Sequence, residues 1–384
     1  MNRATELPLI MAGIPTVNFN VYRRLRFKAG DTVVFLDLGG GETHAIMRDI
    51  EMERARRNKA AKYIHCPADI VPREKLSGDR DSANAQAAAE LLIKSGVSRV
   101  VADRTLPLLF THHLQERGID VTCDTELGIM ERRCKDEWEI EQLRKAQRTT
   151  EQTMQRACEI VADSQAGAGG VLQYRGETLT SEWLRNFIET DLMKSNFAAP
   201  PSIVACGPQG ADCHDLGSGE LRTGMPVIID IFPRDRETLY NGDCSRTVVH
   251  GEPAPTVKEM HRLVLQAKKE AEESARAGVT GEAVHEAACG VFRRAGHHIG
   301  LPGEGDPDSL ICYTHGTGHG VGLDVHEPPL LDRAGPELII GDALTIEPGL
   351  YCRAVGGVRV EDMVIVTEGK CLNLNTIPDG LTWS

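Results

Sequence analysis

Four acidic residues and one histidine in the C-terminal part of the sequence have the side-chain types of a paired divalent-metal site. Two like charges about 4 Å apart repel by ~4 kcal/mol at an effective dielectric constant of ~20, so several buried carboxylates need compensation. Two dications bridged by these carboxylates would remove the repulsion and form a hydrolytic centre. The sequence therefore predicts a metalloenzyme, with the candidate metal ligands Asp230, Asp243, His319, Glu347 and Glu361.

The first two acids flank a predicted hairpin. Asp230 lies in the apolar run 227–232, where a buried aspartate is costly unless a cation or a polar partner accompanies it. Asp243 follows thirteen positions later, just before the apolar run 245–249, and the stretch between them is polar and rich in turn-forming residues. Either acid alone would more often be a turn or capping residue. Together they predict neighbouring strands that each bring one carboxylate to the site.

A glycine-rich run at 315–322 carries His315 and His319, and His326 follows it. Glycines let the backbone approach closely, so that His319 can point its imidazole into a site. The run also resembles a phosphate-binding loop, but no Lys-Ser or Lys-Thr pair follows, which makes that interpretation weak. Three histidines within twelve positions favour chemistry over an ordinary surface or core role.

The last two acids lie in apolar runs that predict strands. Glu347 ends the run 343–347, and Glu361 lies in the run 358–366. The two-residue period of a strand places Arg359 and Glu361 on one face, so we expect Arg359 to orient the Glu361 carboxylate. Oxygen ligands with one imidazole suit Mn²⁺, Co²⁺, Fe²⁺ or Zn²⁺.

Composition restricts the alternatives. A chain of 384 residues favours two domains, and 41% hydrophobic with 26% charged residues is typical of a globular protein. The net charge of −13 argues against a nucleic-acid surface, and no segment has the apolar length of a membrane helix or a signal peptide. Eleven cysteines without a Cys-x-x-Cys pair argue against a disulfide framework or a thiolate zinc site. We therefore expect a cytoplasmic protein.

The elements that must position these residues form two predicted domains. In residues 1–130, strand-like and helix-like segments alternate, which predicts a small α/β domain with a mixed or parallel sheet. Residues 131–384 carry the candidate ligands and further helices. The helices are expected at 50–63, 84–94, 138–161, 178–193, 257–277 and 282–295, and the first two strands at 32–36 and 97–102.

The motifs, taken in order, resemble those of the pita-bread metallopeptidase family. The matching residues are Asp230, Asp243-Cys-Ser-Arg-Thr, His319-Gly-Val-Gly, Thr345-Ile-Glu-Pro-Gly and Arg359-Val-Glu-Asp. The family includes Xaa-Pro aminopeptidases, Xaa-Pro dipeptidases (prolidases), methionine aminopeptidases and metal-free creatinases. The resemblance covers residues 135–384 closely and 1–130 more loosely. It implies an α/β (α+β) fold with a creatinase/prolidase-type domain at 1–130 and a pita-bread catalytic domain with a curved antiparallel sheet at 131–384.

The resemblance also implies residue roles. Asp230 would hold one metal ion, His319 and Glu347 the second, and Asp243 and Glu361 would bridge both. Glu347 would also be the general base, and substrate would contact the histidines His214, His315 and His326. Two divalent ions are expected, Mn²⁺ first and Co²⁺, Zn²⁺ or Fe²⁺ as alternatives. The interval between Asp230 and Asp243 is two residues longer than the family's commonest spacing, which implies a longer hairpin.

The reaction that the resemblance implies is hydrolysis of an N-terminal peptide bond, Xaa-Pro, in a small peptide substrate, and the resemblance also implies a homodimer. Arg333 is the only cation between His326 and Glu347 and could pair with a substrate C-terminal carboxylate, which would favour a dipeptidase, or it could be an exposed loop residue. Two other hypotheses stay open at this point. The same site could serve a non-peptidase metalloenzyme, such as a lyase or a small-amidine hydrolase, or the chain could be a binding module without activity.

Overall fold

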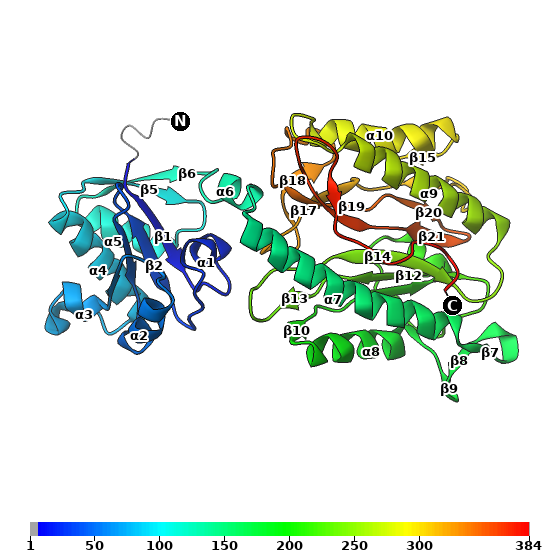
Figure 1. Cartoon of the computed structure of the whole chain (residues 1–384), viewed down its shortest axis with the longest axis horizontal. Helices are drawn as coiled ribbons and strands as arrows, with labels where there is room; N and C mark the ends of the chain where they lie inside the picture. The colour runs from blue at the N-terminus through cyan, green and yellow to red at the C-terminus, as the bar shows by residue number, and fades with distance from the viewer. Residues whose placement is uncertain (1–6, 384) are drawn as a thin grey trace. The chain divides into compact units, whose positions relative to one another are not determined.

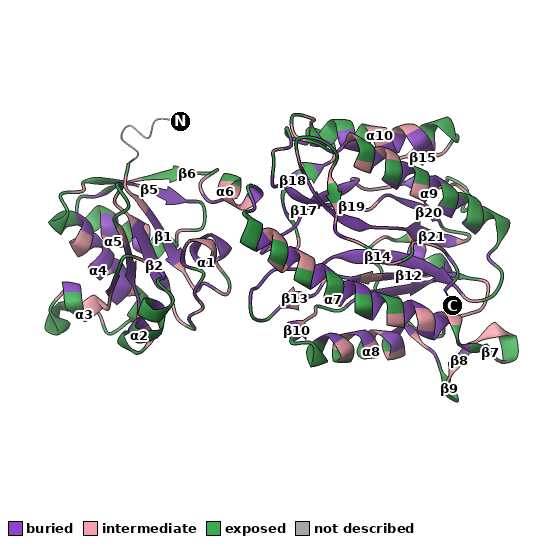
Figure 2. Ribbon diagram, in the orientation of Figure 1, coloured by how far each residue is buried: buried purple, intermediate pink, exposed green. Residues whose placement is uncertain are grey.

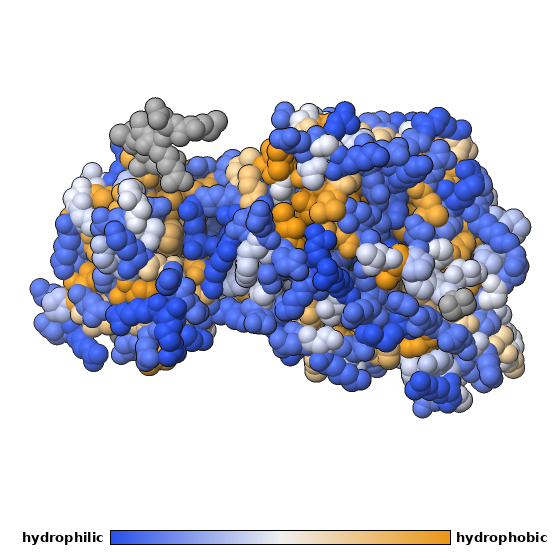
Figure 3. All heavy atoms as spheres, in the orientation of Figure 1, coloured by the Kyte–Doolittle hydropathy of each residue, from blue (hydrophilic) through white to orange (hydrophobic). Residues whose placement is uncertain are grey.

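The computed structural model describes residues 7–383 and divides into two compact units, Met1–Arg132 and Arg133–Ser384 (Figure 1). The division follows Arg132, two positions beyond the domain boundary expected at residue 130. On the face of each unit visible in Figure 3, hydrophilic residues predominate. Within residues 7–383, no helix combines the length and the apolar content that crossing a membrane requires.

The first unit is a six-stranded mixed sheet with the strand order β4-β3-β2-β1-β5-β6. Its strands are β1 (Leu9–Gly13), β2 (Val33–Asp37), β3 (Thr43–Ile46), β4 (Tyr63–His65), β5 (Arg99–Asp103) and β6 (Asp120–Asp124). Its helices are α1 (Phe19–Leu25), α2 (Asp49–Arg57), α3 (Pro67–Ile70), α4 (Arg80–Lys94) and α5 (Leu108–Glu116), and α6 (Ile129–Arg133) runs across the division between the units.

Both faces of this sheet are buried. Ile10 and Met11 are adjacent in β1 and both fully buried, yet they pack into different apolar clusters. Ile10 contributes to the cluster that includes residues of α4 and α5, and Met11 to the cluster that includes residues of α1 and α2. Because side chains alternate along a strand, this division shows helices covering the sheet on two sides. The α/β prediction for this unit is confirmed.

One predicted helix of this unit is too long. We expected a helix at 50–63, but α2 ends at Arg57 and residues 63–65 form β4. Lys59 has a φ of 53°, in the left-handed region that does not continue an α-helix. The charged composition of 50–63 favoured a helix throughout and did not reveal this turn.

The second unit holds antiparallel sheets with helices packed against them. Its helices are α7 (Glu137–Ala162), α8 (Ser181–Lys194), α9 (Pro255–Ser274) and α10 (Gly281–Arg294), close to the expected ranges. The side chain of Asp136 accepts a bond from the Glu139 N–H at 2.8 Å and that of Glu139 accepts one from the Asp136 N–H at 2.9 Å. This capping box sets the start of α7.

The longer sheets of this unit have the orders β11-β12-β14, β15-β16-β20-β21 and β18-β17-β19-β22-β23. Smaller sheets are β10-β13 and β7-β8-β9. The strands are β7 (Gln165–Ala166), β8 (Leu172–Tyr174), β9 (Glu177–Thr178), β10 (Phe197–Ala198), β11 (Ile203–Cys206), β12 (Pro226–Ile231), β13 (Arg234–Asp235), β14 (Cys244–Val249), β15 (His298–Ile299), β16 (Cys312–Tyr313), β17 (Gly318–Gly320), β18 (Glu327–Leu331), β19 (Ala343–Ile346), β20 (Gly349–Cys352), β21 (Gly356–Arg359), β22 (Asp362–Ile365) and β23 (Leu372–Asn373).

Two apolar cores divide the second unit into αβ halves. One core joins α7 and α8 to β11, β12 and β14, and the other joins α9 and α10 to strands β19 to β22. The strands of these two cores are buried, and the helices expose their outer faces (Figure 2). The expectation of a two-domain α/β protein with antiparallel sheets in its C-terminal part is therefore confirmed.

The strand expected at 358–366 is wrong as a single element. β21 ends at Arg359 and β22 begins at Asp362, and the two strands belong to different sheets. Val360 and Glu361 form the short break between them. Most residues of the run are apolar because both strands are buried, so hydrophobicity alone could not reveal the change of sheet.

Candidate metal centre

Strands β12 and β14 bring the first two acids together. They pair in antiparallel register with Asp230 opposite Ser245, and Asp243 lies one residue before β14. The predicted hairpin is confirmed, with Asp243 just outside its second strand. The connection between the strands is anchored to the glycine-rich run, because the Asn241 side chain donates to the Gly322 carbonyl oxygen at 2.8 Å.

The glycine-rich run is a closely packed strand. A Cβ atom on Gly318 would lie 2.0 Å from the Thr345 carbonyl oxygen, and one on Gly320 would lie 2.4 Å from that of Glu327. Only glycine permits this approach, which places His319 in β17 beside β19. Glu347 follows β19 directly, and its N–H donates to the Thr317 carbonyl oxygen at 2.8 Å.

All five candidate ligands line one cavity of about 380 Å³ in the second unit. A ligand atom of each of Asp243, His319 and Glu361 lies within 4.8 Å of the other two. His319 Nε2 lies 3.4 Å from Glu347 Oε1 and 3.9 Å from Asp243 Oδ2. The cavity is also lined by Asp230, His214, His315, His326, Arg359, Asp332, Cys213, Gly316, Gly318, Ile203, Phe232, Val325 and Leu330.

The protein alone does not satisfy these carboxylates. Asp230 Oδ1 and Glu361 Oε2 are buried without a hydrogen-bond partner. Burial and the neighbouring carboxylates raise the pKa of Asp243 and of Glu361 well above their ordinary values. Burial also raises the pKa of Glu347 to about 8, with Asp230 adding to the rise and Arg359 opposing it. Hard oxygen donors that lack partners are the ligands a divalent cation needs, so the donor set fits metal ions.

His319 presents one nitrogen to the site. Its Nδ1 lies 3.1 Å from the Gly320 carbonyl oxygen, which only accepts, so Nδ1 carries the proton. Nε2 is then left with a free lone pair among the carboxylates. Burial, with a contribution from His326, lowers the pKa of His319 to about 4, which keeps the imidazole neutral at neutral pH as a metal ligand must be.

Arg359 orients a different carboxylate from the expected one. Its Nη2 donates to Asp230 Oδ2 at 2.7 Å, and not to Glu361. The strand break at Val360 removes the two-residue alternation that placed Arg359 and Glu361 on one face. Both side chains still line the cavity. Asp230 therefore has one oxygen held by Arg359 and the other, Oδ1, free for a cation.

The three histidines expected to contact substrate differ in how many ring nitrogens are available to a ligand. His315 Nδ1 donates to the Gly316 carbonyl oxygen at 2.7 Å, so its Nε2 accepts from the Tyr351 hydroxyl, also at 2.7 Å. Both nitrogens of His315 are thus occupied by the protein. His214 and His326 are exposed at the cavity wall and their rings keep nitrogens available to a ligand.

Arg333 is exposed and is absent from the described residues that line the cavity. It follows Asp332, which does line the cavity. Burial lowers the pKa of His285 and raises that of Cys289, both on α10, and the charge of Arg333 adds a small lowering to each. The structure therefore does not bring Arg333 together with the other expected site residues.

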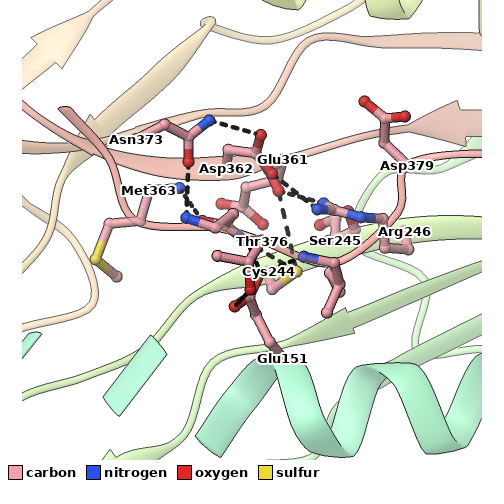
Figure 4. Close-up of polar contacts among 12 residues, drawn as sticks. Glu151, Cys244, Ser245, Arg246, Glu361, Asp362, Met363, Asn373, Thr376 and Asp379 are labelled. Carbon is pink, nitrogen blue, oxygen red and sulfur yellow. Dashed lines mark hydrogen bonds and ion pairs between the residues drawn. The ribbon is translucent and has the colours of Figure 1, made fainter. Parts of the chain in front are cut away.

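A buried ion-pair network behind Glu361 was not expected from the sequence (Figure 4). Arg246 Nη1 donates to the Glu361 carbonyl oxygen at 2.5 Å, and Nη2 donates to Asp362 Oδ1 at 2.8 Å. Lys268 Nζ lies 2.5 Å from the other oxygen of Asp362. Two charged residues in otherwise apolar segments could have indicated the network: Arg246, three positions after Asp243, and Asp362, directly after Glu361.

The sequence also did not indicate Tyr351, whose hydroxyl joins Arg359 to His315.

Sequence comparison identifies relatives of this chain. The model of metallopeptidase family M24 matches residues 141–368. A probable dipeptidase, PepE, from Mycobacterium tuberculosis is 30% identical over 335 residues, which cover 82% of each chain. An Xaa-Pro dipeptidase from Pyrococcus horikoshii is 36% identical over 182 residues, 46% of this chain and 48% of the other.

Solved structures share the whole fold at lower identity. The X-Pro aminopeptidase from Thermotoga maritima superposes with a TM-score of 0.79 at 21% identity, over 98% of this chain and 97% of the other. The prolidase from Pyrococcus horikoshii has a TM-score of 0.75 at 22% identity, over 98% and 95%. The part of the chain that the family model matches, residues 141–368, contains every candidate metal ligand. The chain belongs to metallopeptidase family M24 and is a metallopeptidase.

Proposed function

We propose that this protein is a dinuclear-metal-dependent aminopeptidase or dipeptidase that hydrolyses the first peptide bond of substrates with proline after that bond. The observation that carries the proposal is the convergence of four carboxylates and one imidazole on one cavity, with two carboxylate oxygens left without partners. The Xaa-Pro specificity is supported by the names of the relatives, which are Xaa-Pro dipeptidases and an X-Pro aminopeptidase.

Asp230, Asp243, His319, Glu347 and Glu361 would hold two divalent ions, with Mn²⁺ as the expected metal. When bound, such ions supply Lewis-acid polarisation of the scissile carbonyl and lower the pKa of water at the site. The protein's own part is to fix the ligands. The carbonyl of Gly320 sets the His319 tautomer, and Arg359 fixes one oxygen of Asp230.

Glu347 is the proposed general base. Its carboxylate lies partly buried in the cavity wall, with Oε1 3.4 Å from His319 Nε2, and its backbone is fixed by the hydrogen bond to Thr317. A carboxylate in such a position can take a proton from the attacking water and return it to the departing amine. His214 and His326 are the proposed donors to the substrate, because His315 is occupied by Gly316 and Tyr351.

The cavity also offers an apolar surface for a prolyl ring. Ile203, Phe232, Val325 and Leu330 line it together with the polar cluster. An apolar wall binds the ring through burial of its methylene groups, at about 0.8 kcal/mol for each one removed from water. A peptide with a small charged residue in this position would lose that contribution.

The proposal is tested with the full-length protein after metal removal and reloading with Mn²⁺, Co²⁺, Zn²⁺ or Fe²⁺. Peptides that differ only in the residue after the first bond, Ala-Pro-Ala and Ala-Ala-Ala, are compared by product analysis. Metal-dependent cleavage of Ala-Pro-Ala with at least about tenfold lower kcat/KM for Ala-Ala-Ala is expected. No cleavage of these tripeptides or of the dipeptide Ala-Pro with any metal would reject the peptidase, and equal cleavage of the two tripeptides would reject the proline specificity.

We also propose a homodimer and a cytoplasmic location. The homodimer follows from the resemblance to the pita-bread family and is tested by sedimentation equilibrium, where a monomer at micromolar concentration would contradict it. The location is supported by the eleven cysteines, which are all free in the structure. Cell fractionation with an antibody to the protein tests it.

A further inference from the structure

The charges that line the cavity leave no positive group for the free carboxylate of a dipeptide. Among the described residues of the cavity wall, Arg359 is the only lysine or arginine. The wall carries five carboxylates, on Asp230, Asp243, Asp332, Glu347 and Glu361. Two divalent cations together with Arg359 would balance these five charges. A substrate carboxylate would then enter a site with no compensating charge.

Arg359 itself cannot take this role because its guanidinium is committed to the protein. It donates to Asp230 Oδ2 at 2.7 Å, to the Tyr351 hydroxyl at 3.0 Å and to Ser245 Oγ at 3.1 Å, and also to a backbone carbonyl oxygen of Cys213 at 3.2 Å. Four of its five N–H groups are thus used, and the residue is only 2% exposed. A bidentate bond to a substrate carboxylate would require release of Asp230.

Asp332 makes the wall unfavourable to a second carboxylate. Its side chain is 46% exposed and lies in the cavity wall with Leu330. Oδ1 accepts from the Arg333 backbone N–H at 2.7 Å and lies 3.6 Å from His285 Nε2. In the described part of the chain, no lysine or arginine side chain forms an ion pair with Asp332. The charge of Asp332 therefore faces the cavity without a fixed counter-charge.

We propose that Asp332 is a specificity-determining residue that excludes dipeptides, so that the enzyme acts on peptides continuing beyond the residue after the scissile bond. In such peptides that residue carries an amide, which has no charge to be repelled by Asp332. The inference rests on the proposed function and deepens it from "aminopeptidase or dipeptidase" to aminopeptidase. It also assigns the exposed Arg333 no part in binding a substrate carboxylate.

The experiment compares substrates that differ only in this charge. The Mn²⁺-loaded full-length protein is assayed with Ala-Pro, Ala-Pro amide and Ala-Pro-Ala. We expect kcat/KM for the amide and the tripeptide to exceed that for Ala-Pro by at least about tenfold, which corresponds to ~1.4 kcal/mol in the transition state. Asp332→Asn should raise kcat/KM for Ala-Pro by about fivefold or more and leave the amide nearly unchanged.

Two further variants separate a specific effect of Asp332 from a general effect of charge in this loop and from carboxylate binding by Arg333. Glu337→Gln removes an exposed carboxylate from the same loop, outside the cavity wall, and should keep the wild-type ratio of amide to dipeptide. Arg333→Gln tests whether Arg333 binds the substrate carboxylate, and it should also keep that ratio. Binding of Ala-Pro and Ala-Pro amide to the metal-free protein, measured by calorimetry, gives a comparison without turnover. There too the amide should bind more tightly, and Asp332→Asn should reduce the difference.

The outcomes are distinct. Cleavage of Ala-Pro at least as fast as of its amide overturns the inference and leaves the proposed peptidase intact. A selective loss of Ala-Pro cleavage in Arg333→Gln also overturns it, because it would show Arg333 binding the carboxylate. An equal loss for all substrates in Asp332→Asn overturns it in favour of a role in binding the substrate ammonium group. No cleavage of any substrate would instead count against the proposed function.

Discussion

Replacement of Arg246 by methionine should destabilise the second unit through the ligand segment around Glu361. Arg246 is 1% exposed, and its guanidinium joins the carbonyl of the neighbouring Ser245 to three groups that are distant in sequence. Nε donates to the Pro378 carbonyl oxygen at 2.9 Å, and Nη1 donates to the carbonyl oxygens of Ser245 at 2.9 Å and Glu361 at 2.5 Å. Nη2 donates to Asp362 Oδ1 at 2.8 Å.

The expected loss follows from what remains after the substitution. Removal of one partner from a buried ion pair costs ~3–5 kcal/mol, because the other charge is left uncompensated. Asp362 keeps Lys268 at 2.5 Å, which places Arg246→Met near the lower limit, ~3 kcal/mol. Affinity for Mn²⁺ should fall as well, because the carbonyl of Glu361 loses the donor that fixes it.

The free energy of unfolding is measured by urea titration of metal-free protein, so that the metal does not contribute. Arg222→Met is the matched control. Arg222 is 41% exposed and pairs with Glu220, itself 46% exposed, so its removal should change the free energy by less than ~1 kcal/mol. A loss below ~1 kcal/mol for Arg246→Met, equal to the control, would show that the network contributes no net stability and would refute this reasoning.

The same network predicts a pH dependence. Burial alone would raise the pKa of Asp362, but Arg246 and Lys268 lower it from 3.8 to about 2. A lowered folded-state pKa gives a stability contribution that is complete above pH 3.8 and is lost as the pH falls through about 2. The contribution corresponds to ~2 kcal/mol. Arg246→Met should therefore lose less stability than wild type between pH 4 and pH 2, as measured by urea titration at each pH.

Three further outcomes are expected. Tyr351→Phe leaves Nε2 of His315 without its donor and an N–H of Arg359 without its acceptor, and should lower the free energy of unfolding in urea titration by ~1–3 kcal/mol. An unchanged free energy of unfolding would contradict the structural role of the hydroxyl. Metal removal should lower the melting temperature more at pH 8.5 than at pH 6. Burial raises the pKa of Glu347 to about 8, so the stability that its protonated carboxyl contributes to the metal-free protein is lost as the pH rises through that value. An equal drop at both pH values would oppose this. Gly318→Ala places a Cβ atom 2.0 Å from a backbone carbonyl oxygen and should destabilise the protein by at least ~2 kcal/mol in urea titration, whereas Gly369→Ala, with nothing within 4 Å, should be nearly neutral.

The sequence predicted the elements whose periodicity is long and regular. The helix expected at 138–161 is α7 (Glu137–Ala162), and the hairpin of Asp230 and Asp243 is β12 with β14. The sequence predicted the four acidic ligands because an acid within or beside an apolar strand requires a partner, and it predicted His319 from the surrounding glycines. Their convergence on one cavity follows from the sheet pairing that the fold supplies.

The parts that could not be predicted depend on contacts between distant segments. Periodicity treated 358–366 as one strand, although the chain changes sheets at Val360, and the partner of Arg359 is consequently Asp230. His315 and His326 look alike in sequence, yet only His315 is occupied by a tyrosine from another strand. Likewise, nothing local distinguishes Asp332, in the cavity wall, from the exposed Arg333 beside it.

The row of hydrogen bonds from Arg359 through Tyr351 to His315 has a fixed direction. The Arg359 guanidinium only donates, so the Tyr351 oxygen accepts from it. The Tyr351 hydroxyl in turn donates its hydrogen bond to His315 Nε2, and His315 Nδ1 donates to the Gly316 carbonyl oxygen. A chain of hydrogen bonds can relay protons only if each group in it can both donate and accept. The arginine at one end only donates and the carbonyl at the other only accepts, so this chain cannot reverse its direction. This row therefore fixes the position of His315 and does not carry protons away from the centre.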